Sequence, residues 1–139
     1  MKKYLLHFSD TSWCTAIGLL VLRIGVSGSL MTHGYGKLMN YESLSTKFMG
    51  HMFLSSEFTL SLVIFAELFC AFFVLIGFGT RIFSIPVMYN FIIAITVAHA
   101  ADPFGKMEKA VLFLIVFTTF FILGPGKYSV DYYISKKIK

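Results

Sequence analysis

Hydrophobic residues gather in four long runs separated by short polar stretches. The runs cover residues 13–33, 57–78, 82–101 and 107–124, and the last is the shortest. At about 1.5 Å per residue, a helix over each run can cross a hydrocarbon core of about 30 Å. Because lipid cannot satisfy a bare backbone, the pattern predicts an all-α, polytopic membrane protein built as a four-transmembrane-helix bundle.

The connections between the runs differ in length. The segment GFGTR at residues 77–81 predicts a tight turn that makes spans two and three antiparallel neighbours. Between spans one and two, Leu44, Phe48 and Met52 recur at helical spacing. This predicts a short interfacial helix, capped by Asn40, with a plain polar loop as the alternative. The segment GPG at residues 124–126 predicts the end of the last helix, followed by a basic tail.

Composition supports this class and bounds the chemistry. Hydrophobic residues make up 57% of the 139 residues and charged residues 14%, which suits one compact membrane domain over residues 1–139. Cys14 and Cys70 lie far apart without a CxxC motif, which disfavours a dithiol relay. The first run carries a central Arg23 and no small-residue cleavage site follows it, so we expect a retained span instead of a cleaved signal peptide.

The net charge of +5 concerns topology and lipid headgroups, and the lipid bilayer is the expected partner. Nucleic-acid binding is disfavoured because the cations are divided between chain ends and loops. Four spans place both termini on one side, and Lys and Arg number seven on that side against four on the other. This predicts cytoplasmic termini. The seven are Lys2, Lys3, Arg81, Lys127, Lys136, Lys137 and Lys139, and the four are Lys37, Lys47, Lys106 and Lys109.

Two charges inside the spans require partners, because a charge in the bilayer is costly. Arg23 precedes His33 by ten residues, and Glu67 follows Glu57 by ten. If His33 and Glu57 mark the same interface, both charges lie about 15 Å deep, near the midplane. The offsets predict an Arg23–Glu67 ion pair between the helices. Such a pair can hold two helices in register or line a ligand cavity, and the sequence leaves both open.

A second polar group is expected at the outer end of the bundle, where His33, His99 and Glu108 mark span ends with Lys37 and Asp102 nearby. Histidine with a carboxylate can transfer protons near neutral pH, and a donor of this kind can hydrogen-bond a quinone carbonyl. Alternatively, each His caps a helix or meets headgroups. Metal or haem ligation is disfavoured, since no HxxxH, HExxH or CxxCH spacing is present. We interpret His51 as interfacial. Gly34 and Gly36 suggest a bend that aims Lys37 over the bundle.

Taken in order, these features resemble the DoxX family. Arg23 followed by HGYGK at residues 33–37 resembles its first signature, and Glu67 followed by GFGTR its second. His99 ends the third span, Glu108 opens the fourth, and GPGKYSVD at residues 124–131 resembles its closing GPGxxSxD element. The resemblance covers most of the chain, from about Gly18 to Asp131.

The resemblance implies a small four-helix protein of a bacterial inner membrane, connected with quinone-linked redox work. It implies catalytic roles for His33, His99 and Glu108, and ligand-binding roles for Arg23, Lys37 and Glu67. Quinone is the implied cofactor, without a metal. Since catalytic cysteines are absent, thiol chemistry would require a partner. We therefore expect a quinone-linked oxidoreductase or its subunit, with a redox partner protein and homo-oligomer assembly. The alternatives are a non-enzymatic accessory or assembly subunit and a small transporter.

Overall fold

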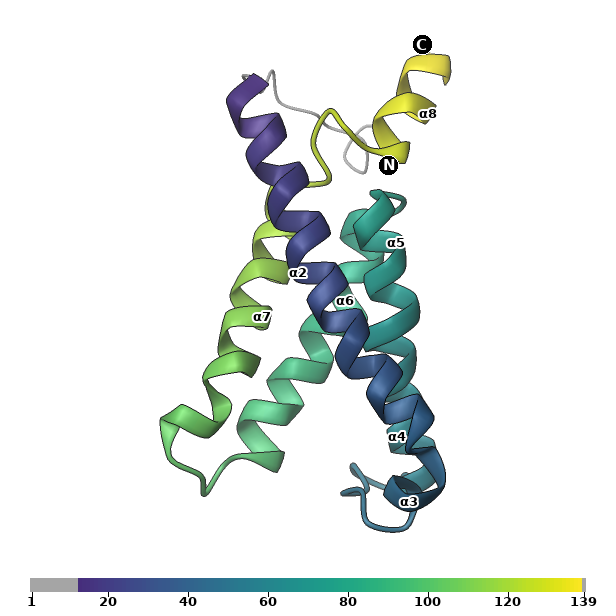
Figure 1. Cartoon of the computed structure of the whole chain (residues 1–139), viewed down its shortest axis with the longest axis vertical. Helices are drawn as coiled ribbons and strands as arrows, with labels where there is room; N and C mark the ends of the chain where they lie inside the picture. Colours follow the sequence, from purple (N-terminus) through teal and green to yellow (C-terminus); the bar gives the residue numbers. More distant parts are fainter. Residues whose placement is uncertain (1–12, 139) are drawn as a thin grey trace.

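The computed structural model describes residues 13–138, and the described residues form helices and loops without strands. The first helix, α2 (Trp13–Met39), buries one face at near-helical spacing: Ala16, Leu19, Arg23, Ser27, Leu30 and Gly34. It runs the length of the bundle and crosses the other helices (Figure 1). The all-α prediction is confirmed for this part of the chain. The predicted first span ends too early, because the helix continues through residues 33–37 to Met39 without a bend.

The second span is one continuous helical stretch with a change of winding in its middle. It consists of α4 (Ser56–Ile64), the π-helical segment η1 (Phe65–Cys70) and α5 (Ala71–Ile76). Ser55 caps its start, since the side chain accepts a hydrogen bond of 3.3 Å from the backbone N–H of Phe58. The stretch ends at Gly77, whose φ of 73° is easily reached only by glycine.

The predicted tight turn follows directly. Gly77 and Gly79 both adopt left-handed backbone conformations, and the chain reverses into α6 (Thr80–Ile93), which continues as the π-helical segment η2 (Ala94–Ala98). The carboxylate of Asp131 caps α6 from a distant part of the chain by accepting hydrogen bonds from Gly79 N (2.8 Å) and Thr80 N (3.3 Å). The turn is therefore fixed by the C-terminal segment as well as by its own glycines.

The helix α7 (Phe104–Leu123) packs along α6, and α8 (Val130–Ile138) follows at the opposite end of the bundle from the short helix α3 (Tyr41–Ser45) (Figure 1). We call these two ends the α3 end and the α8 end. Within the segment predicted to form an interfacial helix, α3 is the helical part, and Met52 has a positive φ of 56°, outside any helix. Asn40 precedes α3 but does not cap it, because its side chain donates to Gly36 O at 2.8 Å.

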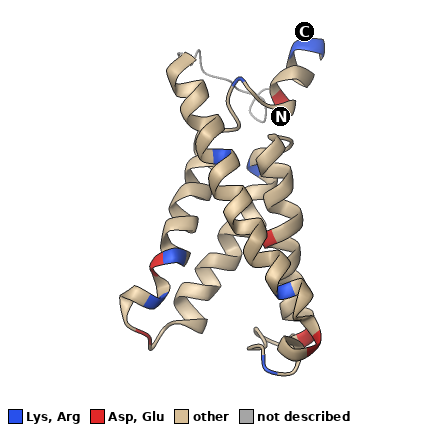
Figure 2. Cartoon of the chain, viewed as in Figure 1, with Lys and Arg blue, Asp and Glu red and all other residues tan. Residues whose placement is uncertain are grey.

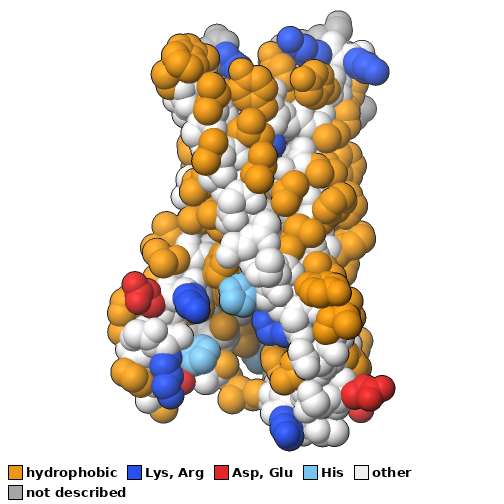
Figure 3. Space-filling view, viewed as in Figure 1, with side chains coloured by type: hydrophobic (Ala, Val, Ile, Leu, Met, Phe, Trp, Pro, Cys, Tyr) orange, Lys and Arg blue, Asp and Glu red, His pale blue; other side chains and the backbone are white. Residues whose placement is uncertain are grey.

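Of the helical stretches in residues 13–138, three are long and apolar enough to cross a membrane: Trp13–Met39, Ser56–Ile76 and Thr80–Ala98. The helix α7 has 20 residues, but its first two turns hold Lys106, Glu108 and Lys109. Charged residues gather toward the two ends of the bundle (Figure 2). Hydrophobic side chains cover much of the flanks (Figure 3), which are the surfaces that lipid contacts in a protein of this kind.

The interior core is small and aromatic. Phe117 and Phe120 of α7 are fully buried against Leu30 of α2 and Val74 and Val87 of the neighbouring helices. The residues of the candidate site lie nearer the α3 end.

Candidate functional site

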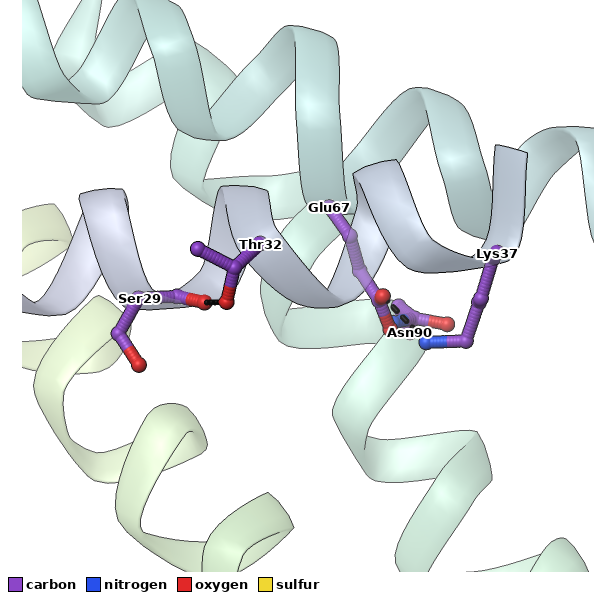
Figure 4. Close-up of polar contacts among 5 residues, drawn as sticks. All are labelled: Ser29, Thr32, Lys37, Glu67 and Asn90. Carbon is purple, nitrogen blue, oxygen red and sulfur yellow. Dashed lines mark hydrogen bonds and ion pairs between the residues drawn. The ribbon is translucent and has the colours of Figure 1, made fainter. Parts of the chain in front are cut away.

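The centre of the site is a buried carboxylate held by three helices. Glu67 is 4% exposed. Its Oε2 accepts from the ammonium of Lys37 on α2, and its Oε1 accepts from Asn90 Nδ2 on α6 at 3.1 Å (Figure 4). Burying a carboxylate is costly unless both oxygens are satisfied, and here one cation and one amide satisfy them. We call these three residues the Glu67 cluster.

Local backbone features bring the cluster together. Glu67 lies inside η1, and π-helical turns shift the side chains that follow relative to a regular α-helix, which is why they are common at functional sites. On the facing helix, a Cβ added to Gly34 would lie 2.9 Å from Leu68 N and 3.1 Å from Glu67 Cβ. Only glycine at position 34 therefore allows α2 to approach η1 this closely, and this approach brings Lys37 within reach of the carboxylate.

A cavity of about 440 Å³ opens beside the cluster. Its walls come from one face each of α2, the α4–η1 stretch, α6 with η2, and α7, with part of the loop after α3. Figure 3 shows a hollow near the α3 end where hydrophobic, histidine and lysine side chains meet. The apolar residues lining the cavity include Leu30, Val63, Phe91, Ala94, Val97 and Phe113, and the polar ones are His33, Lys37, Lys47, His51, Thr59, Glu67, Asn90, His99, Lys106 and Lys109.

The two predicted histidines both line this cavity. His33 contacts Phe113 edge-on, with ring centroids 6.0 Å apart. His99 follows η2, and its Nδ1 lies 2.9 Å from Asp102 Oδ2, while Lys106 Nζ lies 3.0 Å from Asp102 Oδ1. These two hydrogen bonds, first that of His99 and then that of Lys106, hold the pKa of Asp102 below its usual value. The sequence prediction that His33, His99, Lys37 and Asp102 lie at one end of the bundle is met.

The predicted Arg23–Glu67 pair is wrong. The guanidinium of Arg23 donates instead to three backbone carbonyls: Leu75 O at 3.0 Å, Pro125 O and Tyr128 O. Gly34, not Arg23, lies opposite Glu67, and Arg23 is eleven residues or about 16 Å nearer the α8 end. The continuation of α2 to Met39, six residues beyond His33, accounts for about 9 Å of this difference.

Arg23 therefore does not line the cavity. It fixes the GPG segment and the chain after it onto α2 and α5, close to Gly77. Arg23 is 2% exposed, and its ligand-binding role in the sequence prediction does not fit this geometry.

Glu108 lies at the predicted end of the bundle, in the first turns of α7, but it does not line the cavity. The residues of α7 that line the cavity are Lys106, Lys109, Ala110 and Phe113, which share one helical face. Glu108 is exposed and lies off that face. It therefore does not join His33 and His99 in the cavity.

Sequence reasoning assigned no role to Asn90 and read His51 as interfacial, yet both line the cavity. The signal for Asn90 was its place inside an apolar run, since a polar side chain in a span needs a partner. His51 lies in the loop after α3, where its Nε2 is 3.1 Å from the Tyr89 hydroxyl. No spacing pattern connects that loop with α6. Among the described residues, no three His, Cys, Asp or Glu side chains gather in a way that could hold a metal ion.

The fold and the cavity define a class: an all-helical membrane protein with a polar site between its helices, open near one end. Comparison with known protein families identifies DoxX over residues 18–100, which is more than half of the chain. The protein therefore belongs to the DoxX family. Neither the curated proteins nor the solved structures include a match to the chain.

Proposed function

We propose that this DoxX-family protein is a quinone-linked redox protein, or the quinone-binding subunit of a membrane oxidoreductase complex. The observation that carries the proposal is the cavity beside the Glu67 cluster. Its volume of about 440 Å³ lies in the range of small-molecule sites, which are mostly apolar with a few placed polar groups. Phe91 and Phe113, whose rings stack 5.1 Å apart, offer an apolar wall for a flat ring.

The donors in the cavity suit the carbonyl oxygens of a quinone. Lys37 has three N–H donors and Asn90 has two, and binding Glu67 uses one from each. The remaining donors can therefore serve a ligand without breaking the cluster. His33, on the same face of α2 as Lys37, provides a third donor that also lines the cavity.

Proton movement is the chemistry for which the chain's own side chains are suited. A bound quinone would supply electron transfer coupled to proton uptake or release. Glu67 can hold a proton at the inner part of the cavity, where Lys37 and Asn90 keep the carboxyl in place. His99, hydrogen-bonded to Asp102 and partly exposed, can exchange protons with the aqueous side.

The electrons would come from outside the chain. Cys70 is fully buried, Cys14 is exposed, and both are free thiols. We therefore propose that a redox partner protein or a small reductant supplies electrons. Assembly into a homo-oligomer stays a prediction.

We further propose that α7 is a fourth span and that both termini face the cytoplasm of a bacterial inner membrane. The helix α7 runs beside α6 and is 20 residues long, enough for about 30 Å. Among the described residues, apart from Arg23, four Lys or Arg residues lie toward each end of the bundle. The excess on the side of the termini comes from Lys2, Lys3 and Lys139, which lie outside the described residues. Arg23, bound to the C-terminal segment, adds a cation toward that side.

Equilibrium binding of a short-chain quinone to the purified protein tests the proposal. Asn90→Leu removes one donor from the cavity, and we expect up to about tenfold weaker binding, the effect of one hydrogen bond. Asn40→Leu is the matched control, because Asn40 is exposed and does not line the cavity. Equal affinities for the two variants, or no saturable binding by the wild type, would overturn the proposal and favour an accessory role.

A further inference from the structure

Cations surround the part of the cavity nearest the α3 end. Lys47 comes from the loop after α3, and Lys106 and Lys109 from the start of α7. The side chains of His51 and His99 lie among them. Among the residues that the structure describes, Glu67 is the single carboxylate that lines the cavity, and Lys37 neutralises it. We call Lys47, Lys106 and Lys109 the lysine rim.

The rim keeps charge that the described residues do not neutralise. Asp102 accepts from both Lys106 and His99, so one carboxylate serves that pair. Lys47 and Lys109 are exposed, and no carboxylate of the described chain lies within ion-pair distance of either. Two cations thus line an apolar cavity without a partner, which raises the local potential for an anion.

The start of α7 adds to this potential. Its first turn contains no acidic residue, and Pro103, which precedes it, provides no side-chain cap. Unpaired N–H groups and the helix dipole make a helix start favourable for anions and unfavourable for lysines. Lys106 and Lys109 lie in the first two turns, where cations are unfavourable, and Asp102 and Glu108 offset only part of this charge.

We propose that the lysine rim binds a phosphate group. Lysines bind phosphate as point charges, and three of them on two different segments can surround one group. The phosphate can belong to the head of an anionic phospholipid or to a free phosphate. The apolar residues behind the rim, among them Phe48 and Val97, favour an amphiphile whose chain enters the cavity. The proposal does not depend on quinone binding.

The test uses the full-length protein in a mild detergent. Binding of a short-chain phosphatidylglycerol, a short-chain phosphatidylcholine and inorganic phosphate is measured by calorimetry at two salt concentrations. We compare the wild type with the double variant Lys47→Gln/Lys109→Gln. The double variant Lys136→Gln/Lys137→Gln on α8 is the matched control, since it removes the same charge from exposed positions of the other end.

We expect phosphatidylglycerol to bind more tightly than phosphatidylcholine, and more weakly as salt rises. The rim variant should weaken this binding by about 25-fold, because each Lys near an anionic headgroup contributes roughly a factor of five. The α8 variant should leave it unchanged. Inorganic phosphate that binds as tightly, with the same loss in the rim variant, would support the site and assign it to a free anion.

Two results would overturn the proposal. Equal binding of phosphatidylglycerol and phosphatidylcholine would show that the apolar cavity alone selects the ligand. An equal loss in the rim and α8 variants would show a general effect of net charge. Short-chain quinone binding is also measured in the rim variant, in which the Glu67 cluster is unchanged. This measurement separates the phosphate proposal from the quinone proposal.

Discussion

Replacing Arg23 by alanine tests how the C-terminal segment is held on the bundle. The buried guanidinium donates to the carbonyls of Leu75, Pro125 and Tyr128. A hydrogen bond from a charged group contributes about 1.5–3 kcal/mol in water-soluble proteins, and bonds inside membranes measure closer to about 0.6 kcal/mol. Three such bonds, at about 1 kcal/mol each, give an expected loss of about 3 kcal/mol.

For a chain of this length, that loss lowers the unfolding midpoint by roughly 6–12 °C. Thermal unfolding of the detergent-solubilised protein, followed by circular dichroism, measures it. Limited proteolysis should also cut the GPG segment faster, because that segment loses two of its anchors.

Arg81→Ala is the matched control. Arg81 also donates to a backbone carbonyl, Ile122 O at 3.0 Å, but it does so at the surface. This surface bond contributes about 1 kcal/mol or less, so we expect Arg81→Ala to lose less stability than Arg23→Ala. If Arg23→Ala and Arg81→Ala unfold at the same temperature, the three-carbonyl contact of Arg23 does not stabilise the protein as the structure indicates.

Three further predictions concern the contacts that shape the bundle. Gly34→Ala should destabilise the protein by about 1–3 kcal/mol, because the new Cβ meets the backbone of η1. Gly28→Ala should not destabilise it, because the space around that Cβ is open. Similar unfolding midpoints for the two variants would contradict this prediction. Asp131→Ala should cost about 1 kcal/mol and speed hydrogen exchange at the start of α6, and unchanged exchange there would count against the capping role. Because the pKa of Asp102 is lowered, its contribution to stability is present above the usual carboxyl pKa and is lost as the pH falls through the lowered value. Carboxyl NMR should show the titration midpoint of Asp102 rising in His99→Gln. An unchanged midpoint would refute the hydrogen bond from His99 as the cause of the lowered pKa.

The apolar runs predicted the helices well because span length is set by bilayer thickness and by backbone hydrogen bonding. Three of the four predicted runs coincide within a few residues with the stretches Ser56–Ile76, Thr80–Ala98 and Phe104–Leu123. The tight turn was predicted equally well, since Gly77 and Gly79 can adopt the left-handed backbone conformations that the turn requires. Such features depend on local chemistry, which a single sequence contains.

The partners of the buried charges Arg23 and Glu67 could not be predicted in the same way. The segment HGYGK has the composition of a bend, yet α2 continues through it because Gly34 packs on η1. A helix end misplaced by six residues shifts the depth of every residue by about 9 Å. Partner choice for Arg23 and Glu67 therefore depended on a tertiary contact that no local pattern specifies.

The C-terminal helix α8 has a sequence pattern from which a helix could have been predicted. Val130, Ile134 and Ile138 recur at helical spacing, and Lys136 and Lys137 lie between them, which is the pattern of an amphipathic helix. From the sequence we predicted only a basic tail after the GPG segment. In contrast, the π-helical segments that place Glu67 and His99 have no periodic signature, because one extra residue per turn changes no apolar run.

We propose that the cavity beside the Glu67 cluster binds a quinone. Photo-crosslinking with a photoreactive short-chain quinone, followed by mass spectrometry of the labelled peptides, tests it most directly. We expect labels within residues 90–99 and 106–113, competed away by unlabelled quinone and reduced in Asn90→Leu. Labels confined to the lipid-facing flanks of the helices, or labels that unlabelled quinone does not displace, would contradict it.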